Sequence, residues 1–249
     1  MSKRVNIGNL LSSISIDCVV FGFKEGRLHV LLLKWKGIDK WALPSGFIQK
    51  EENLNNAAVR ILQTRTGVSL PFLDQLYTFG DNDRKHSKEI IDSFSNEVLS
   101  EDLKDWIMQR FISTAYISLV KIDECNIAPD HLSDACKWIA IDEVPDLILD
   151  HNLMIEKGIE KLRHELNYLP IGLNILDQKF TMKDLQQLYE SILARPLDRG
   201  NFQKKMLKLG FLDRHEKKLN CGAHKAPYLY SINTVKYNQI LSQGIGFIN

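Results

Sequence analysis

The sequence has few cysteines, and they are too scattered to form a disulfide framework or a zinc site. The four thiols belong to Cys18, Cys125, Cys136 and Cys221, and no two of them have the close spacing of a metal-binding or redox motif. Disulfide-dependent secreted proteins place their cysteines densely. We therefore expect buried, reduced thiols in a cytoplasmic protein.

Long hydrophobic runs are also missing. Serines and Asp17 interrupt the apolar stretch at residues 10–22, and no later segment approaches the roughly eighteen apolar residues of a membrane span. We predict neither a leader nor contact with a membrane. Hydrophobic residues make up 44% of the chain, which is enough to build a sizeable core in one or two domains.

Charge is divided unevenly along the chain. Residues 1–170 hold 20 basic and 25 acidic side chains, whereas residues 171–249 hold 12 basic and 6 acidic ones. An acidic body joined to a basic end indicates that only the C-terminal part meets a polyanion.

The first two thirds of the sequence mix strands and helices. Runs of β-branched and aromatic residues predict two strands joined by a Glu25-Gly26 turn, and an amphipathic helix that stops at Gly67 follows them. The predicted strands are 15–23, 28–35, 41–47, 76–79, 111–120 and 137–141, and the predicted helical segments are 53–66, 86–109 and 154–166. This order predicts an α+β or α/β sandwich.

A specific spacing surrounds the first predicted helix. Gly46 is followed by Glu52 after five residues, by Arg60 after seven more and by Gly67 after six more. This spacing resembles the Nudix box; the alternative is that the spacing is coincidental. The similarity extends over about residues 15–166. The resemblance implies a Nudix-like α/β/α sandwich with a mixed sheet, within an α+β chain.

The metal-binding positions of that box carry no carboxylates. Nudix helices hold magnesium through carboxylates three and four residues apart, and the metal neutralises a diphosphate and activates water. Here those positions are Ile61, Thr64 and Arg65, which do not bind a divalent cation. We predict binding without hydrolysis. The alternative is a magnesium-dependent pyrophosphohydrolase with displaced ligands, for which the available carboxylates are Glu51, Glu52, Asp81 and Asp83.

The resemblance places a ligand against the 41–47 segment and the box helix. Trp35 or Trp41 is a candidate for the aromatic face of a sugar pocket, unless it belongs to the core. The segment at about 85–109 is an insertion relative to the family, and it either covers the pocket, joins a dimer interface or forms a surface excursion. The candidate ligand-binding residues are Lys34, Trp35, Trp41, Ser45, Gly46, Arg60, Arg65 and Arg84.

After residue 170 the sequence has the order helix, short turn, helix and two strands. Thr181 is the expected N-cap of the first helix, with Asp184 as an imperfect capping-box partner. Asp198 caps the second helix and Gly210 stops it. The predicted helices are 181–193 and 198–209, and the predicted strands are 211–214 and 228–232. This order is typical of a winged helix.

Residues 169–237 resemble the winged helix of NrtR-like, Nudix-related transcriptional regulators. In that family a degenerate Nudix domain senses a metabolite and the tail binds a palindromic operator. Some branches respond to ADP-ribose and others to sugars such as arabinose, and the run at 150–163 looks more like the sugar branch. We predict a Nudix-like domain at 1–168 and a winged-helix domain at 169–249, in a homodimer.

The second helix of the tail is the expected recognition helix. Its first turns meet base edges, so Arg199, Asn201 and Gln203 are the candidates for reading sequence. The candidates for phosphate or wing contacts are Lys204, Lys205, Lys208, Lys217, Lys218, His224 and Lys225. Each is otherwise an ordinary surface charge, and it is their joint placement that favours DNA.

These features predict a ligand-responsive transcriptional regulator that is not an enzyme. Its expected partners are double-stranded operator DNA, a sugar or ADP-ribose-like effector and a second copy of the chain. No cofactor is expected, and magnesium enters only under the hydrolase alternative. A third possibility is that the wing contacts RNA or a protein.

Overall fold

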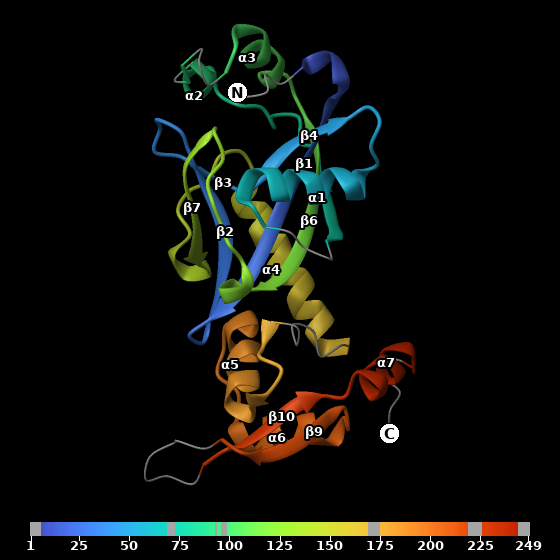
Figure 1. The fold of residues 1–249 in the computed structure, drawn as a ribbon. Coiled ribbons are helices and arrows are strands. Elements are labelled where there is room, and N and C mark those ends of the chain that lie inside the picture. Colours follow the sequence, from blue (N-terminus) through green and yellow to red (C-terminus); the bar gives the residue numbers. More distant parts are fainter. Residues whose placement is uncertain are drawn as a thin grey trace. The chain divides into compact units, whose positions relative to one another are not determined.

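The computed structural model describes residues 6–68, 73–92, 94–95, 99–168, 175–218 and 226–243. The chain divides into two compact units, residues 1–22 with 29–158 and residues 23–28 with 159–249. Both units are drawn in Figure 1. Within the described ranges, no helix combines the length and the apolar character needed to cross a membrane. The predicted domain boundary at 168/169 stays a prediction.

The first unit is built on a mixed β-sheet, in the order β3-β2-β1-β6-β5, with β4 paired to β1 and β7 paired to β2. The β1–β4, β2–β3, β2–β7 and β5–β6 pairs are antiparallel. Three single-turn 3₁₀ helices lie at Ile7–Asn9, Ile122–Glu124 and Ile141–Glu143. The strands are β1 Leu10–Lys24, β2 Arg27–Trp35, β3 Trp41–Ala42, β4 Ser45–Gln49, β5 Asp74–Phe79, β6 Ile112–Lys121 and β7 Ser133–Ala140.

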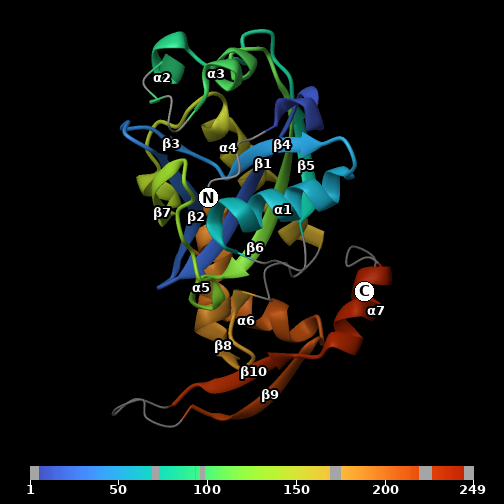
Figure 2. The ribbon, with the colours of Figure 1, turned by 45° about the horizontal axis from the view of Figure 1, so that its top comes forward.

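Helix α1 (Leu54–Thr66) and the part of α4 (His151–Tyr168) that belongs to the first unit, up to Gly158, lie on opposite faces of this sheet, as Figures 1 and 2 show. The alternation of side chains along β1 explains the two layers. Ile16, Cys18 and Val20 join the buried cluster that includes the apolar side of α1. Phe21 points the other way, because a Cβ atom on Gly158 of α4 would lie 2.9 Å from its ring. A sheet between two helix layers is the α/β/α sandwich that the sequence predicts.

The 85–109 insertion contains two short helices, α2 (Lys88–Asp92) and α3 (Glu101–Ile107), and not one continuous helix. Its apolar side chains form a separate buried cluster that includes Ile91, Phe94 and Trp106. Trp35 and Phe47 from the sheet pack against that cluster. The insertion is therefore a packed part of the first unit.

The second unit has the winged-helix order. Its three-stranded sheet runs β8-β10-β9, with antiparallel pairing. The short strand β8 and the last helix α7 were not predicted from the sequence. The elements are β8 Phe180–Thr181, α5 Met182–Leu193, α6 Arg199–Lys208, β9 Leu212–Lys217, β10 Tyr228–Ile232 and α7 Thr234–Gln243.

Side-chain caps fix the starts of both winged-helix helices. The Asp184 carboxylate accepts from the Thr181 N–H at 2.8 Å, and the Thr181 hydroxyl accepts from the Asp184 N–H at 3.2 Å. The capping box is therefore complete, and the expectation of an imperfect one is wrong. Asp198 caps α6 by accepting from the Asn201 N–H at 2.8 Å.

Candidate functional site

Helix α1 places the three box positions in different surroundings. Ile61 is buried and contacts Gly46 of β4. Thr64 is exposed to solvent. Arg65 is buried and forms an ion pair with Asp130. An apolar contact and an internal ion pair thus occupy two of the three positions.

Glu52, the remaining acidic residue of the box, is held by Arg60. The Arg60 Nε donates to Glu52 Oε2 at 2.9 Å, and the Gln49 N–H donates to the other oxygen at 2.7 Å. The hydrogen bond from Arg60 is the main cause that keeps the pKa of Glu52 below its usual value. Arg60 also donates to the Phe47 carbonyl at 2.8 Å, so this pair ties α1 to β4.

A buried polar network lies on the α4 side of β1, around Asp17. Its Oδ2 accepts from Arg84 at 3.0 Å and from the Ser113 hydroxyl, and its Oδ1 lies 3.2 Å from His151 Nε2. Burial raises the pKa of Asp17, but His151, Arg84 and Ser113 together outweigh that effect and hold the pKa well below its usual value. Asp17 is therefore an ionised carboxylate in the interior.

Arg84 and His151 are each fixed by a second partner. Arg84 Nε donates to both Asp150 oxygens at 3.0 Å, so one guanidinium is shared by two carboxylates. The Leu43 N–H donates to His151 Nδ1 at 3.0 Å, which leaves the imidazole proton on Nε2, facing Asp17. The network thus sets one guanidinium and one neutral imidazole against two carboxylates, so it keeps a net negative charge.

A cavity of about 110 Å³ lies beside this network. The sheet, the 85–109 insertion and the start of α4 all contribute to its lining, and each supplies both polar and apolar residues or backbone. The residues around it are Ser15, Asp17, Trp35, Ser45, Gly46, Phe47, Arg65, Arg84, Lys85, His86, Ile91, Phe94, Leu99, Ile107, Gln109, Phe111, Leu132, Ile148, Leu149 and His151.

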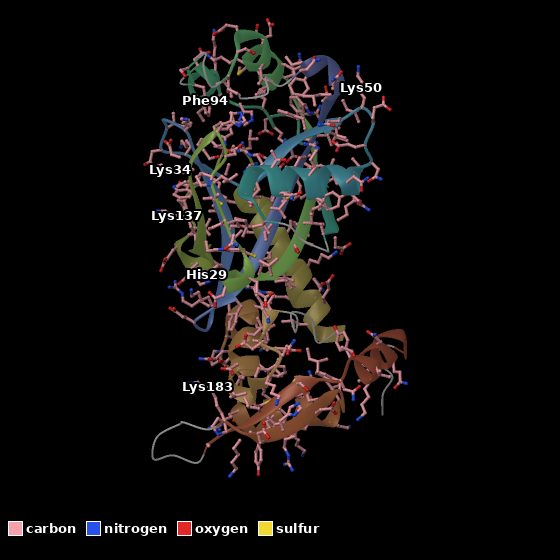
Figure 3. All side chains as sticks on the ribbon, in the orientation of Figure 1. His29, Lys34, Lys50, Phe94, Lys137 and Lys183 are labelled. Carbon is pink, nitrogen blue, oxygen red and sulfur yellow. The ribbon has the colours of Figure 1, made fainter. Side chains whose placement is uncertain are left out.

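The insertion provides an aromatic wall for this cavity. The Trp35 ring centroid lies 5.0 Å from that of Phe94, which Figure 3 labels, and 5.4 Å from that of His86. Burial, with the nearby positive groups, lowers the pKa of His86 to about 4. His86 therefore presents a neutral imidazole at neutral pH. The sequence left three roles open for the insertion: a cover over the pocket, a dimer interface or a surface excursion. In the structure, residues of the insertion line the cavity, which agrees with the first of these.

The predicted ligand-binding residues fall into two groups. Three of them do not border the cavity: Lys34, labelled in Figure 3, pairs with Asp39 at 2.8 Å, Trp41 lies in β3 and Arg60 holds Glu52. The five that do border it are Trp35, Ser45, Gly46, Arg65 and Arg84. Their contact with a ligand stays a prediction.

The second unit exposes the predicted DNA-contacting residues on α6 and β9. Phe202 and Met206 of α6 are buried, and the Phe202 ring lies 5.2 Å from that of Tyr189 on α5. Gln203 is half-buried, and His224 and Lys225 lie outside the described residues. The exposed candidates are Arg199, Asn201, Lys204, Lys205, Lys208, Lys217 and Lys218.

The sequence matches two known domain families. Residues 12–160, which are more than half of the chain, match the NUDIX domain. The chain belongs to the Nudix family. Residues 172–232 match the NrtR DNA-binding winged helix domain, so this Nudix chain has the NrtR-like architecture that the sequence predicted.

Individual relatives match most of the chain's length at low identity. The ADPR responsive transcriptional repressor NtrR of Acinetobacter baylyi is 23% identical over 233 residues, which cover 90% of this chain and 84% of that protein. The crystal structure of Shewanella oneidensis NrtR with a 27mer DNA has a TM-score of 0.68 at 23% identity, and the match covers 91% of this chain and 96% of that one. A MutT/nudix family protein from Enterococcus faecalis has a TM-score of 0.65 at 18% identity, over 89% and 86% of the two chains.

The residues of this Nudix domain do not fit the divalent cation that the family's box implies. Ile61 is apolar, Arg65 is a cation, and the Glu52 carboxylate is engaged by Arg60. No cluster of three or more His, Cys, Asp or Glu side chains suited to a metal occurs in the described ranges. The donor set therefore supports no metal-dependent step.

Most residues of the site were not proposed from the sequence, and three of them carry titratable groups of the buried network or the aromatic wall. Asp17, His151 and His86 line the cavity but come from β1, α4 and the insertion, and only tertiary folding brings them together. One signal pointed to Asp17, because an acidic residue inside a buried apolar strand needs a partner. No comparable signal marks His86.

Proposed function

We propose that this Nudix-family chain is a metabolite-responsive transcriptional regulator and not a hydrolase. The observation that carries the proposal is the replacement of the metal-binding carboxylates by buried Ile61 and ion-paired Arg65, in a chain whose second unit exposes cations on a winged helix. The names of the Acinetobacter and Shewanella relatives support the same reading. On this proposal the protein acts in the cytoplasm as a homodimer.

The proposed DNA contacts divide between α6 and the wing. Arg199, Asn201 and Gln203 lie in the first turns of α6, where a recognition helix meets base edges. Phosphates would be neutralised by Lys204, Lys205, Lys208, Lys217 and Lys218, with the predicted His224 and Lys225 completing the wing. Two copies would then bind half-sites about 34 Å apart, or a multiple of that distance.

The proposed effector is a small, uncharged sugar. The cavity offers an aromatic wall at Trp35 and Phe94 and polar groups that match hydroxyls, such as Ser45. A diphosphate needs uncompensated cations. The buried cations at the cavity, Arg84 and Arg65, are already paired with carboxylates, which favours a neutral ligand.

An ADP-ribose-like effector is the second candidate, and the name of the Acinetobacter relative favours it. Lys85 borders the cavity and is exposed, so one cation is available to an anionic ligand. Such a ligand is much larger than one sugar ring, so part of it would extend beyond the cavity.

A mobility shift with duplex DNA from upstream of the protein's own gene tests the proposed function. We expect retardation at moderate salt that an effector changes, and loss of it in Arg199→Ala. Lack of retardation with and without metabolites would reject DNA binding. Turnover of ADP-ribose with Mg²⁺ that Glu52→Gln abolishes would instead favour the hydrolase alternative.

Calorimetry against pentoses, hexoses and ADP-ribose identifies the effector. We expect heat from a sugar, at least tenfold weaker binding in Trp35→Leu and unchanged binding in Trp41→Leu, because only Trp35 borders the cavity. Tight binding of ADP-ribose without any sugar binding would move the assignment to the second candidate.

A further inference from the structure

Strand β9 contains a bulge that changes the face of the sheet on which one cationic side chain lies. Arg214 and Lys217 are three residues apart, so a regular strand would place their side chains on opposite faces. The register between β9 and β10 shifts between the Tyr230–Arg214 pair and the Tyr228–Lys217 pair. Strand β9 therefore has one residue more than β10 between these two pairs. A bulge of this kind shifts the alternation of side chains by one residue, so Arg214 and Lys217 lie on the same face of the sheet.

Both cations therefore lie over one aromatic ring. The Arg214 Cζ is 4.7 Å and the Lys217 Nζ is 5.3 Å from the centroid of the Tyr228 ring. A cation at such a distance is attracted to the face of the ring. Tyr228 thus holds together two like charges that would otherwise separate.

The side chains of Arg214, Lys217 and Tyr228 lie on the same face of the winged-helix sheet as its buried aromatic residues, but nearer to solvent. Tyr230 pairs with Phe180 on one side and Arg214 on the other, and both aromatic rings are buried. Tyr228 lies two residues earlier on the same face and is 42% exposed. The three side chains Arg214, Lys217 and Tyr228, which we call the wing triad, therefore stand beyond the buried core of the second unit.

The nearby carboxylates do not neutralise the triad. Glu216 lies 3.5 Å from the Lys179 Nζ, and Asp213 accepts from the Asn233 side chain at 3.1 Å. Within the described ranges neither Arg214 nor Lys217 has an ion pair of its own. Two positive charges thus stay available beside the Tyr228 ring.

We propose that the wing triad is a phosphate-binding site for the backbone of duplex DNA, with Arg214 and Lys217 as contacts and Tyr228 as the residue that positions them. The proposal rests on the proposed DNA-binding function and adds two residues, Arg214 and Tyr228, to the interface. Phosphate contacts carry no sequence information, so the triad contributes affinity and not specificity.

The salt dependence of binding tests this site. Binding of a labelled duplex from the protein's own upstream region, and of a shuffled duplex, is measured over a range of salt concentrations. We expect Arg214→Gln and Lys217→Gln each to lower the slope of log K against log salt by about 0.9, because each removes one cation that neutralises a phosphate. The preference for the upstream duplex over the shuffled one should not change.

Two further variants separate positioning from folding. Tyr228→Leu should lower the slope although it removes no charge. Tyr228→Phe, which keeps the ring, should have the wild-type slope. The double variant Lys183→Gln, Lys236→Gln removes two exposed charges outside the triad and should leave the slope nearly unchanged; Figure 3 labels Lys183. Thermal unfolding of every variant checks the fold.

The possible outcomes are distinct. Wild-type slopes in the Arg214 and Lys217 variants would show that the wing triad does not bind phosphate, and the proposed function would be unaffected. Failure of the wild-type protein to bind any duplex would overturn both. Tighter binding of single-stranded RNA than of duplex DNA would overturn the assignment to duplex DNA.

Discussion

Ile61 and Gly46 are in direct contact: a Cβ atom on Gly46 would lie 3.0 Å from Cγ1 of Ile61. The glycine leaves room on β4 for the aliphatic side chain of α1, and Ile61 is 2% exposed. The position that a Nudix enzyme gives to a metal-binding carboxylate is therefore part of the hydrophobic core.

Ile61→Glu should destabilise the protein strongly, because it buries a carboxylate against an apolar layer. We expect a loss of about 3 kcal/mol or more in the free energy of unfolding, measured with urea. Thr64→Glu is the matched control, since Thr64 is exposed, and should change stability by less than about 0.5 kcal/mol. A wild-type protein that gains stability on addition of Mg²⁺ would contradict the conclusion that the box does not fit a metal.

Arg84→Met should leave the buried Asp17 carboxylate without its guanidinium partner. Breaking a buried pair from one side costs about 3–5 kcal/mol, because the remaining charge is uncompensated. Asp17→Asn in the same background should recover part of that loss. Arg195→Met, at an exposed position, is the control and should be nearly neutral in the same urea titration. Equal losses for the two arginine variants would show that the network contributes little.

His86→Gln should flatten the pH dependence of stability. The pKa of His86 is about 4 in the folded protein, below its usual 6.5. Between these values the unfolded chain binds a proton that the folded chain does not, so stability falls as the pH drops from 6.5 towards 4. The contribution is at most about 3 kcal/mol. Unfolding measured at pH 7 and pH 4.5 gives the difference, and identical pH slopes for both proteins would contradict it.

The sequence predicted correctly those features that depend on residues close together in the chain. The bounds of β10 agree with the predicted 228–232, and Asp198 caps α6 as expected. The capping box at Thr181 and the apolar stripe of α1 lie within a few residues of sequence. Such features are visible without knowledge of the fold.

Tertiary packing decided the features that sequence reasoning missed. The apolar pattern of 86–109 suggested a helical segment, but after α2 the Phe94 N–H donates to the Ile91 carbonyl in a tighter turn, and Phe94 packs on Trp35. The partnership of Asp17 with His151 joins β1 to the start of α4, which no periodicity reveals. Five of the residues that line the cavity were therefore proposed from the sequence, but the contacts that join the buried network across β1, Arg84 and α4 were not.

Two glycines, one in the first turn of α6 and one just after its C-terminal end, give predictions of opposite sign. Gly200 lies in the first turn of α6, and the nearest atom to a Cβ there would be an Asp198 carboxylate oxygen at 3.5 Å, an ordinary contact. Gly200→Ala should therefore stabilise the second unit by about 0.5–1 kcal/mol, because alanine loses less backbone entropy in a helix. Gly210 has a φ of +75°, so Gly210→Ala should destabilise it by about 1 kcal/mol even though the space is open. Thermal unfolding of the two variants checks both signs, and a loss of stability in Gly200→Ala would mean that the first turn of α6 is not a regular helix.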